Sequence, residues 1–169
     1  MREHINGIKN NDYWFYDKYP NCKEVLILGP SNAGKSTLIN ALNGAYDGLG
    51  GEKVAYVAKR SGKTFQLNFY HSTHRDSKKK QGMIVDSPGY GRTSAPVKLK
   101  KLWWRMIQRY LCYGIRLNMI LLCIPAHIGL KQQDLDVIEE LKYFNKGVHV
   151  VLTKVDKVKN NDQLVRTMS

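Results

Sequence analysis

The sequence contains no apolar stretch long enough to cross a membrane as a helix. Its longest apolar run, residues 119–126, is far short of the ~20 residues that a membrane-spanning helix needs, and no apolar signal segment opens the chain. We therefore expect a soluble intracellular protein with no membrane partner. The sequence does not distinguish the cytoplasm from the matrix of a mitochondrion or plastid.

Cysteine is scarce as well. Cys22, Cys112 and Cys123 are an odd number and lack the spacing of metal ligands. This argues against a disulfide-stapled scaffold or a cysteine metal site, and we expect reduced thiols, with Cys123 buried in an apolar strand. The 169 residues are enough for one good hydrophobic core, so we expect one domain.

Acidic residues are few: 14 Asp and Glu accompany 27 Lys and Arg, for a net charge of +13. Such an excess favours polyanionic partners. The cations gather in a polar stretch between two expected strands (Arg75, Lys78, Lys79, Lys80) and along an expected helix that also carries Trp103, Trp104 and Tyr110 (Lys98, Lys100, Lys101, Arg105, Arg109, Arg116). Two interpretations stay open at each place: contact with ribosomal RNA, with aromatic rings for stacking, or an ordinary solvated surface.

A glycine-containing stretch, residues 29–36, fits the phosphate-binding loop pattern G-x-x-x-x-G-K-[ST]. It lies between an expected buried strand, residues 25–28, and an expected helix, residues 36–42. Glycines let backbone N–H groups turn toward an anion, and the helix N-terminus adds partial positive charge. We expect Lys35 to reach the outer phosphates of a nucleotide and the Ser36 hydroxyl to hold Mg²⁺.

Two further motifs each follow an expected strand. After residues 83–85, residues 86–89 have the form D-x-x-G, in which Asp86 lies near Mg²⁺, usually through water, and the Gly89 amide faces the γ-phosphate. After residues 148–152, residues 153–156 have the form [NT]-K-x-D. The Asp156 carboxylate can accept two hydrogen bonds from guanine N1–H and N2, a donor pair that adenine lacks, so the motif favours GTP over ATP. Either motif alone also fits an ordinary turn.

The three motifs, in this order, resemble the translation-factor-like GTPases and, more closely, the EngB (YihA/YsxC) family of ribosome-assembly GTPases. The resemblance implies a GTPase domain at residues 22–159, an N-terminal extension at residues 1–21 and a tail at residues 160–169. Beyond the three motifs, the residues that carry it are Gly62, Lys63, Thr64, Gln66, Leu67, Asn68, Phe69, Tyr90, Gly91, Trp103, Tyr110, Leu111, Leu130, Lys131, Asp134 and Lys157. Ser61 and Pro125 depart from the family pattern, which has a proline and an acidic residue at these places.

The resemblance also implies which residues form the site. The implied nucleotide contacts are Ser31, Asn32, Ala33, Gly34, Lys35, Ser36, Thr37, Gly89, Thr153, Lys154 and Asp156. The implied catalytic residues are Lys35, Thr64 and Gly89, and the implied Mg²⁺ ligands are Ser36, Thr64 and Asp86. Thr64 is our choice for the metal-binding threonine of the mobile loop, with Thr73 and Thr93 as alternatives. Asn32 is implied as a ligand of K⁺, which would supply positive charge to the transition state; the alternative is an asparagine that only stabilises the loop.

Position 90, where Ras-like enzymes place a water-orienting glutamine, holds Tyr90, so we expect slow turnover. The function implied is a slow switch that hydrolyses GTP to GDP and phosphate during assembly of the large ribosomal subunit. The alternative is a truncated module that binds GTP, GDP and RNA with little turnover. Only 169 − 156 = 13 residues follow Asp156, too few for the final strand, guanine-supporting loop and helix of the family, so we expect a C-terminal truncation.

The remaining expected elements are a strand at residues 65–70, helices at residues 97–113 and 130–144, and a strand at residues 119–124. In the last helix, Leu135, Ile138 and Leu141 are the expected apolar positions. Alternating strands and helices predict an α/β P-loop GTPase domain with a mostly parallel sheet and helices on both faces, lacking the final strand and helix. We expect a monomer whose nucleotide lies at the carboxyl ends of the strands.

Overall fold

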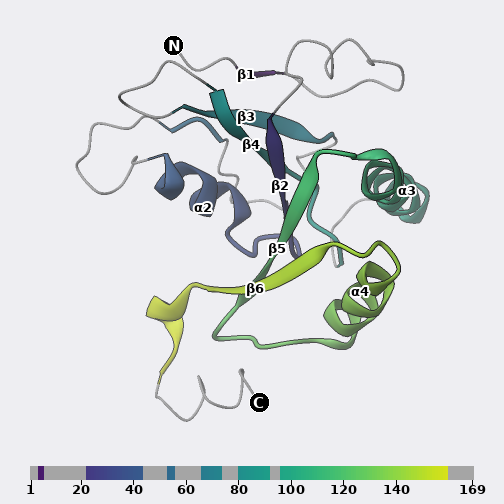
Figure 1. Cartoon of the computed structure of the whole chain (residues 1–169). Helices are drawn as coiled ribbons and strands as arrows, with labels where there is room; N and C mark the ends of the chain where they lie inside the picture. The colour runs from purple at the N-terminus through teal and green to yellow at the C-terminus, as the bar shows by residue number, and fades with distance from the viewer. Residues whose placement is uncertain are drawn as a thin grey trace.

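A single sheet organises the chain (Figure 1). The computed structural model describes residues 4–5, 22–43, 53–55, 66–73, 80–91 and 96–159. Within these residues the sheet has six strands in the order β1-β3-β4-β2-β5-β6. They are β1 (His4–Ile5), β2 (Lys23–Leu28), β3 (Asn68–Thr73), β4 (Lys80–Asp86), β5 (Leu117–Pro125) and β6 (Gly147–Thr153).

The sheet is mostly parallel, as predicted. β2 lies between β4 and β5 and is parallel to both, and β6 is parallel to β5. β3 runs antiparallel to β4, and the short β1 runs antiparallel to β3. The four parallel strands therefore end at the same edge of the sheet, where the segments that follow them meet.

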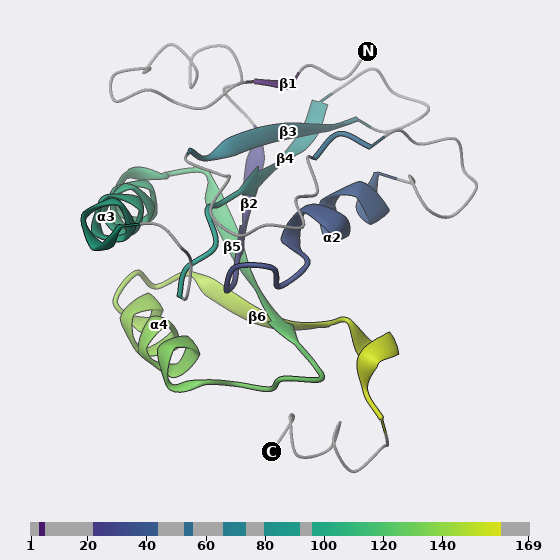
Figure 2. The same ribbon diagram turned by 180° about the vertical axis from the view of Figure 1, so that it is seen from behind.

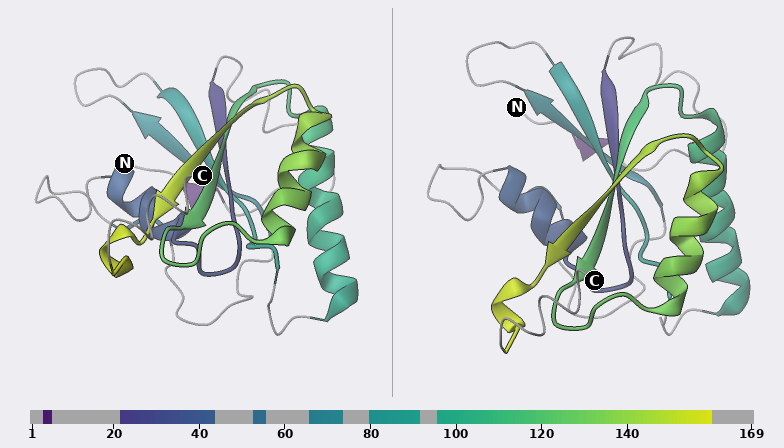
Figure 3. Two further views of the ribbon diagram at one scale, coloured as in Figure 1. Left: turned by 90° about the horizontal axis from the view of Figure 1, so that it is seen from below. Right: turned by 60° about the horizontal axis from the view of Figure 1, so that its bottom comes forward.

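Helices cover both faces of the sheet, which confirms the predicted layering. α2 (Lys35–Leu42) lies on one face, whereas α3 (Val97–Tyr113) and α4 (Gln132–Lys142) lie side by side on the other (Figures 2 and 3). A short 3₁₀ helix, η1 (Val155–Lys157), follows β6. In the described ranges, no helix has the length and apolar character that crossing a membrane requires.

Alternation along the strands divides the core between the two faces. In β2, Leu26 and Leu28 pack toward α3 and α4, and Ile27 packs toward α2. In β5, Ile120, Leu122 and Ile124 belong to the first cluster and Cys123 to the second. Cys123 is fully buried, as predicted, and burial raises the pKa of its thiol to about 11. Cys22 is buried as well, and Cys112 is exposed.

Two details of the prediction were wrong. The strand expected at residues 65–70 begins at Asn68, because its pairing with β4 runs from Asn68 opposite Asp86 to Thr73 opposite Lys80. Leu135 is 44% exposed, whereas Val137 is buried. The stripe that α4 presents to the core consists of positions 134, 137, 138 and 141, the spacing of one helix face. Leu135 lies outside that stripe.

In the described part of the chain, β6 pairs with β5 alone and forms an edge of the sheet. Val150 of β6 is 51% exposed, and Leu42 of α2 is 61% exposed. Within the described residues, Val150 and the unpaired backbone groups of β6 therefore lie at the edge where the resemblance implies a further strand.

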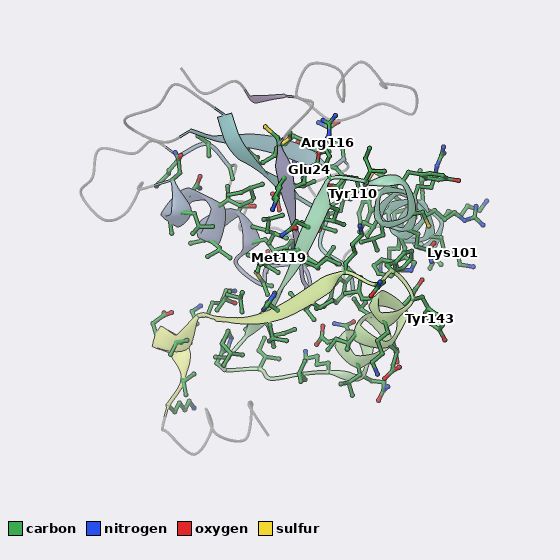
Figure 4. The ribbon with its side chains drawn as sticks, in the orientation of Figure 1. Glu24, Lys101, Tyr110, Arg116, Met119 and Tyr143 are labelled. Carbon is green, nitrogen blue, oxygen red and sulfur yellow. The ribbon has the colours of Figure 1, made fainter. Side chains whose placement is uncertain are left out.

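A buried carboxylate, that of Glu24, joins the start of β2 to α3. Glu24 is fully buried, and one of its oxygens accepts a hydrogen bond from the Tyr110 hydroxyl, while Oε1 has no hydrogen-bond partner among the described residues. Arg116 lies close to both residues in Figure 4, and its carbonyl accepts the Glu24 N–H at 2.9 Å. Burial raises the pKa of the Glu24 carboxyl, against the Tyr110 hydrogen bond and the Arg116 charge, which lower it.

We predict that Glu24→Gln raises the melting temperature at pH 8 and removes part of the pH dependence of stability. The folded chain holds the Glu24 proton more tightly than the unfolded chain, so stability falls as pH rises from the ordinary value of 4.5 through the raised folded pKa. Gln keeps the acceptor for Tyr110 without the buried charge. Thermal melts of both proteins at pH 5 and pH 8 test this, and an unchanged pH slope in the variant would contradict it.

Candidate functional site

The three sequence motifs converge at the carboxyl ends of the parallel strands. β2 leads into residues 29–36, which we call the phosphate loop; β4 ends at Asp86, which opens the D-x-x-G segment, residues 86–89; and β6 ends at Thr153, which opens the guanine motif, residues 153–156. Because these strands are parallel and close together in the sheet, the three segments meet at one edge.

The phosphate loop depends on a glycine where β2 ends. A Cβ on Gly29 would lie 2.5 Å from the carbonyl oxygen of Cys123, so only glycine fits against β5. The backbone then turns through left-handed conformations at Asn32 and Gly34, with φ of 63° and 94°. α2 starts directly afterwards, with the Leu38 N–H bonded to the Gly34 carbonyl at 2.8 Å. The N-terminus of α2 therefore opens onto the loop, as predicted.

Lys35 lies inside the loop that precedes it. Its side chain is buried, and Nζ donates to the carbonyl oxygens of Gly29 and Pro30, both at 3.0 Å. Burial lowers the pKa of the ammonium, against the attraction of Asp86, which raises it. A lysine with two of its three donors on loop carbonyls is fixed in position and keeps one donor for an anion.

Asp86 and Ser36, which we predict to bind the metal, lie next to each other. The Ser36 hydroxyl donates to Asp86 Oδ2 at 3.3 Å. Burial raises the pKa of Asp86 to about 6, against Lys35 and Ser36, which lower it. Asp86 Oδ1 is buried without a hydrogen-bond partner in the described structure. An orphaned carboxylate oxygen beside a hydroxyl fits Mg²⁺, which prefers oxygen ligands. The other predicted ligand, Thr64, lies outside the described residues, as does its alternative Thr93.

The D-x-x-G segment and the residue after it pack directly on the phosphate loop. The Ser31 N–H donates to the Tyr90 carbonyl at 3.0 Å, and the Tyr90 N–H donates to the Gly29 carbonyl at 3.3 Å. A Cβ on Gly89 would lie 2.6 Å from Ser31 Cα and 3.0 Å from Lys35 Nζ. Any residue larger than glycine at position 89 would therefore push this segment off the loop.

The guanine motif is tied to the other side of the loop. The Thr153 hydroxyl donates to the Ala33 carbonyl, and Lys154 Nζ donates to the Asn32 carbonyl. Lys154 has a left-handed backbone with φ of 54°, an uncommon conformation for a residue with a side chain. Asp156 follows in η1 and is exposed, as is Thr37 on the first turn of α2. All the predicted site residues in the described ranges thus belong to one cluster of segments.

Sequence reasoning missed Asn40. This side chain is fully buried; its Nδ2 donates to the Ala55 carbonyl, and its Oδ1 accepts the N–H groups of Val54 and Ala55, each at 2.8 Å. Asn40 thereby fastens residues 54–55 to α2. Its position one helical turn after Ser36 and next to the apolar Ile39 in α2 was the available signal.

Sequence reasoning also missed the partner of Tyr90. The Tyr90 hydroxyl donates to Asp134 Oδ1 at 2.8 Å, and Asp134 Oδ2 accepts the Lys131 N–H at the start of α4, also at 2.8 Å. The Asp134 side chain is 1% exposed. The residue that follows the D-x-x-G segment is therefore bonded to the first turn of α4.

Comparisons with known proteins agree with this geometry. Residues 24–154 match the family described as "50S ribosome-binding GTPase". The protein of Thermotoga maritima described as "Probable GTP-binding protein EngB" is 36% identical over 140 residues, which are 83% of this chain and 65% of that protein. The protein of the same description from Natranaerobius thermophilus is 34% identical over 143 residues, 85% of this chain and 68% of that protein.

Among solved structures, Era of Aquifex aeolicus bound to GDP.AlF4⁻ superposes with a TM-score of 0.64 at 26% identity, covering 86% of this chain and 44% of that chain. In sequence, the chain spans 65% of the length of the Thermotoga maritima relative. With its three motifs on one edge of a P-loop GTPase fold, it belongs to the EngB family of GTP-binding proteins.

Proposed function

We propose that this chain binds GTP and GDP together with Mg²⁺ and hydrolyses GTP slowly, as a switch in assembly of the large ribosomal subunit. The observation that carries the proposal is the convergence of the phosphate loop, the Asp86–Ser36 pair and the guanine motif on one edge of the sheet. Family membership and the guanine nucleotide in the Era structure support it. We assign the nucleotide-binding domain to residues 22–159.

The phosphate contacts fall to the loop and to the start of α2. The backbone N–H groups of residues 34–37 and the third donor of Lys35 are the proposed phosphate donors, whereas the Ser31 N–H is bonded to the Tyr90 carbonyl until residues 89–91 move. Mg²⁺, when bound, would neutralise phosphate charge; Ser36 and Thr64 are its proposed ligands, with Asp86 acting through water. The buried, unpaired Oδ1 of Asp86 supports this assignment, because a buried carboxylate oxygen without a partner is costly until a cation reaches it.

In the proposed reaction water attacks the γ-phosphate, which leaves GDP and inorganic phosphate. Lys35 holds the phosphoryl oxygens, and the Gly89 amide and Thr64 respond to the γ-phosphate. Tyr90 stands where Ras-like enzymes have a glutamine that orients the attacking water, and a phenol cannot orient water in the same way. The second candidate is a module that binds GTP, GDP and RNA with little or no turnover, and the tyrosine at position 90 favours it.

We assign Asn32 as the ligand of a K⁺ ion that adds positive charge beside the phosphates. Its left-handed backbone exposes the side chain at the rim of the loop, while its carbonyl is held by Lys154. Turnover should be faster in K⁺ than in Na⁺ at equal ionic strength, and Asn32→Ala should remove the difference. Equal rates of the unmodified chain in the two salts would contradict a K⁺ site and leave the Mg²⁺ site untouched.

We predict that Asp156→Asn reverses guanine selectivity. The carboxylate presents two acceptors to guanine N1–H and N2, whereas an amide presents one acceptor and one donor. GDP affinity should fall by about 10- to 100-fold, the range of one or two lost hydrogen bonds to a charged group, and xanthosine diphosphate should bind better than GDP. Calorimetric titration with GDP, xanthosine diphosphate and ADP measures this. An unmodified chain that binds ADP and GDP equally would contradict the guanine assignment.

The outer face of α3 is the surface that we assign to ribosomal RNA. α3 contains no acidic residue, and Lys98, Lys101, Arg105 and Arg109 are exposed on one side of it. Figure 4 shows Lys101 pointing away from the sheet. At 1.5 Å per residue this row is about 16 Å long, and in the described residues no acidic side chain pairs with these four cations.

Trp103 is buried and Trp104 donates to Glu140, so neither ring is free for stacking on a base. The cluster at residues 75–79 lies outside the described residues.

We predict that Arg105→Glu together with Arg109→Glu weakens binding to isolated large ribosomal subunits at least about tenfold. The pair should also reduce the slope of log K against log salt concentration, because each lost phosphate contact removes about 0.7 from that slope for single strands. Lys23→Glu with Lys142→Glu makes the same change in net charge at exposed positions on other elements and is the matched control. Co-sedimentation at several salt concentrations measures both. An equal loss of affinity in the two double variants would show that net charge alone matters and would contradict the assignment of α3 as the RNA-binding surface.

A further inference from the structure

We propose that Tyr90 is a specificity-determining residue that sets the preference of this site for GDP over GTP. Its hydroxyl, held by Asp134, keeps residues 89–91 on the phosphate loop, and a γ-phosphate can enter only when this segment moves away. The inference rests on the proposed function, because it concerns the third phosphate of the nucleotide assigned there.

The loop side that would face a third phosphate is already occupied by the chain itself. The Ser31 N–H is bonded to the Tyr90 carbonyl, and Gly89 lies against Ser31 and beside Lys35 Nζ, with no room for even a methyl group on its Cα. A diphosphate needs only the amides toward α2 and the lysine. The structure therefore accommodates a diphosphate with residues 89–91 in place, whereas a triphosphate has to displace them.

The segment is fastened at its far end to α4. Asp134 is buried and bonded to the backbone of Lys131, and α4 packs into the core through Val137 and Leu141. Gly91, with φ of 89°, adds a close contact: a Cβ there would lie 2.7 Å from the side-chain oxygen of Gln133. Displacing residues 89–91 therefore breaks the Tyr90–Asp134 hydrogen bond, because Asp134 is not free to follow.

A small hollow separates part of the segment from α3. A hollow of about 50 Å³ is lined by residues 88–91 and, from α3, by Lys100, Trp103, Trp104 and Ile107. Displacement breaks the hydrogen bonds of residues 89–91, and the bond from the Tyr90 hydroxyl to the Asp134 carboxylate belongs to the strongest class among them. Removing it should favour the triphosphate alone.

The experiment compares the unmodified chain with Tyr90→Phe and with the matched control Tyr110→Phe. Both substitutions remove a tyrosine hydroxyl that donates to a buried carboxylate. Tyr110, however, bonds Glu24 at the start of β2, whereas the phosphate loop follows the end of β2. The affinities for Mg²⁺-GDP and for a GTP analogue with a non-hydrolysable β,γ bridge are measured by titration calorimetry. We expect Tyr90→Phe to raise the ratio of triphosphate to diphosphate affinity about tenfold, the size of one such hydrogen bond, and Tyr110→Phe to leave it unchanged.

A second variant, Asp134→Ala, removes the same bond from the α4 side. It should shift the ratio as Tyr90→Phe does, and the double variant should shift it no further, which marks one shared interaction. A shift of the melting temperature by GDP shows that each variant is folded. Wild-type ratios in both single variants, or equal shifts in Tyr110→Phe, would overturn the role of Tyr90. An unmodified chain that binds neither nucleotide would instead overturn the proposed function on which it rests.

Discussion

The site depends on a buried ammonium. Lys35 Nζ is held by the carbonyls of Gly29 and Pro30, and Asp86 is the opposite charge that acts on it most strongly. Burial lowers the pKa of the lysine and raises that of Asp86 to about 6, so each charge is costly without the other. An anion on the free donor of Lys35 and a cation on Asp86 Oδ1 would relieve both costs together. The loop is therefore built to gain from a metal–phosphate complex.

A chain of contacts leads from this loop to the basic face of α3. Tyr90, which pairs with the loop, bonds Asp134 at the start of α4, and Glu140 near the end of α4 accepts hydrogen bonds from Trp104 and Gln108 of α3. α4 thus contacts residues 89–91 near its start and, through Glu140 near its end, the proposed RNA-binding helix.

Most of the fold and the positions of the three motifs could be predicted, because strand and helix periodicity and loop chemistry are local. The α3 boundaries, the parallel sheet and the closeness of Ser36 to Asp86 followed from those patterns. The Asn40 contacts with Val54 and Ala55 and the Tyr90–Asp134 bond could not be predicted, because each joins residues 14 or more positions apart and depends on how the elements pack. The start of β3 was missed for a similar reason, since pairing with β4 decides it.

The central claim is that Lys35 organises a nucleotide phosphate site at this edge of the sheet. Titration calorimetry of Mg²⁺-GDP into the unmodified chain and into Lys35→Ala tests it most directly, with thermal melting of both chains as the check on folding. The account predicts saturable binding of one GDP by the unmodified chain and at least about 100-fold weaker binding by a folded Lys35→Ala chain, the loss of charge-assisted contacts to phosphate. Equal GDP affinity in the two chains would contradict it.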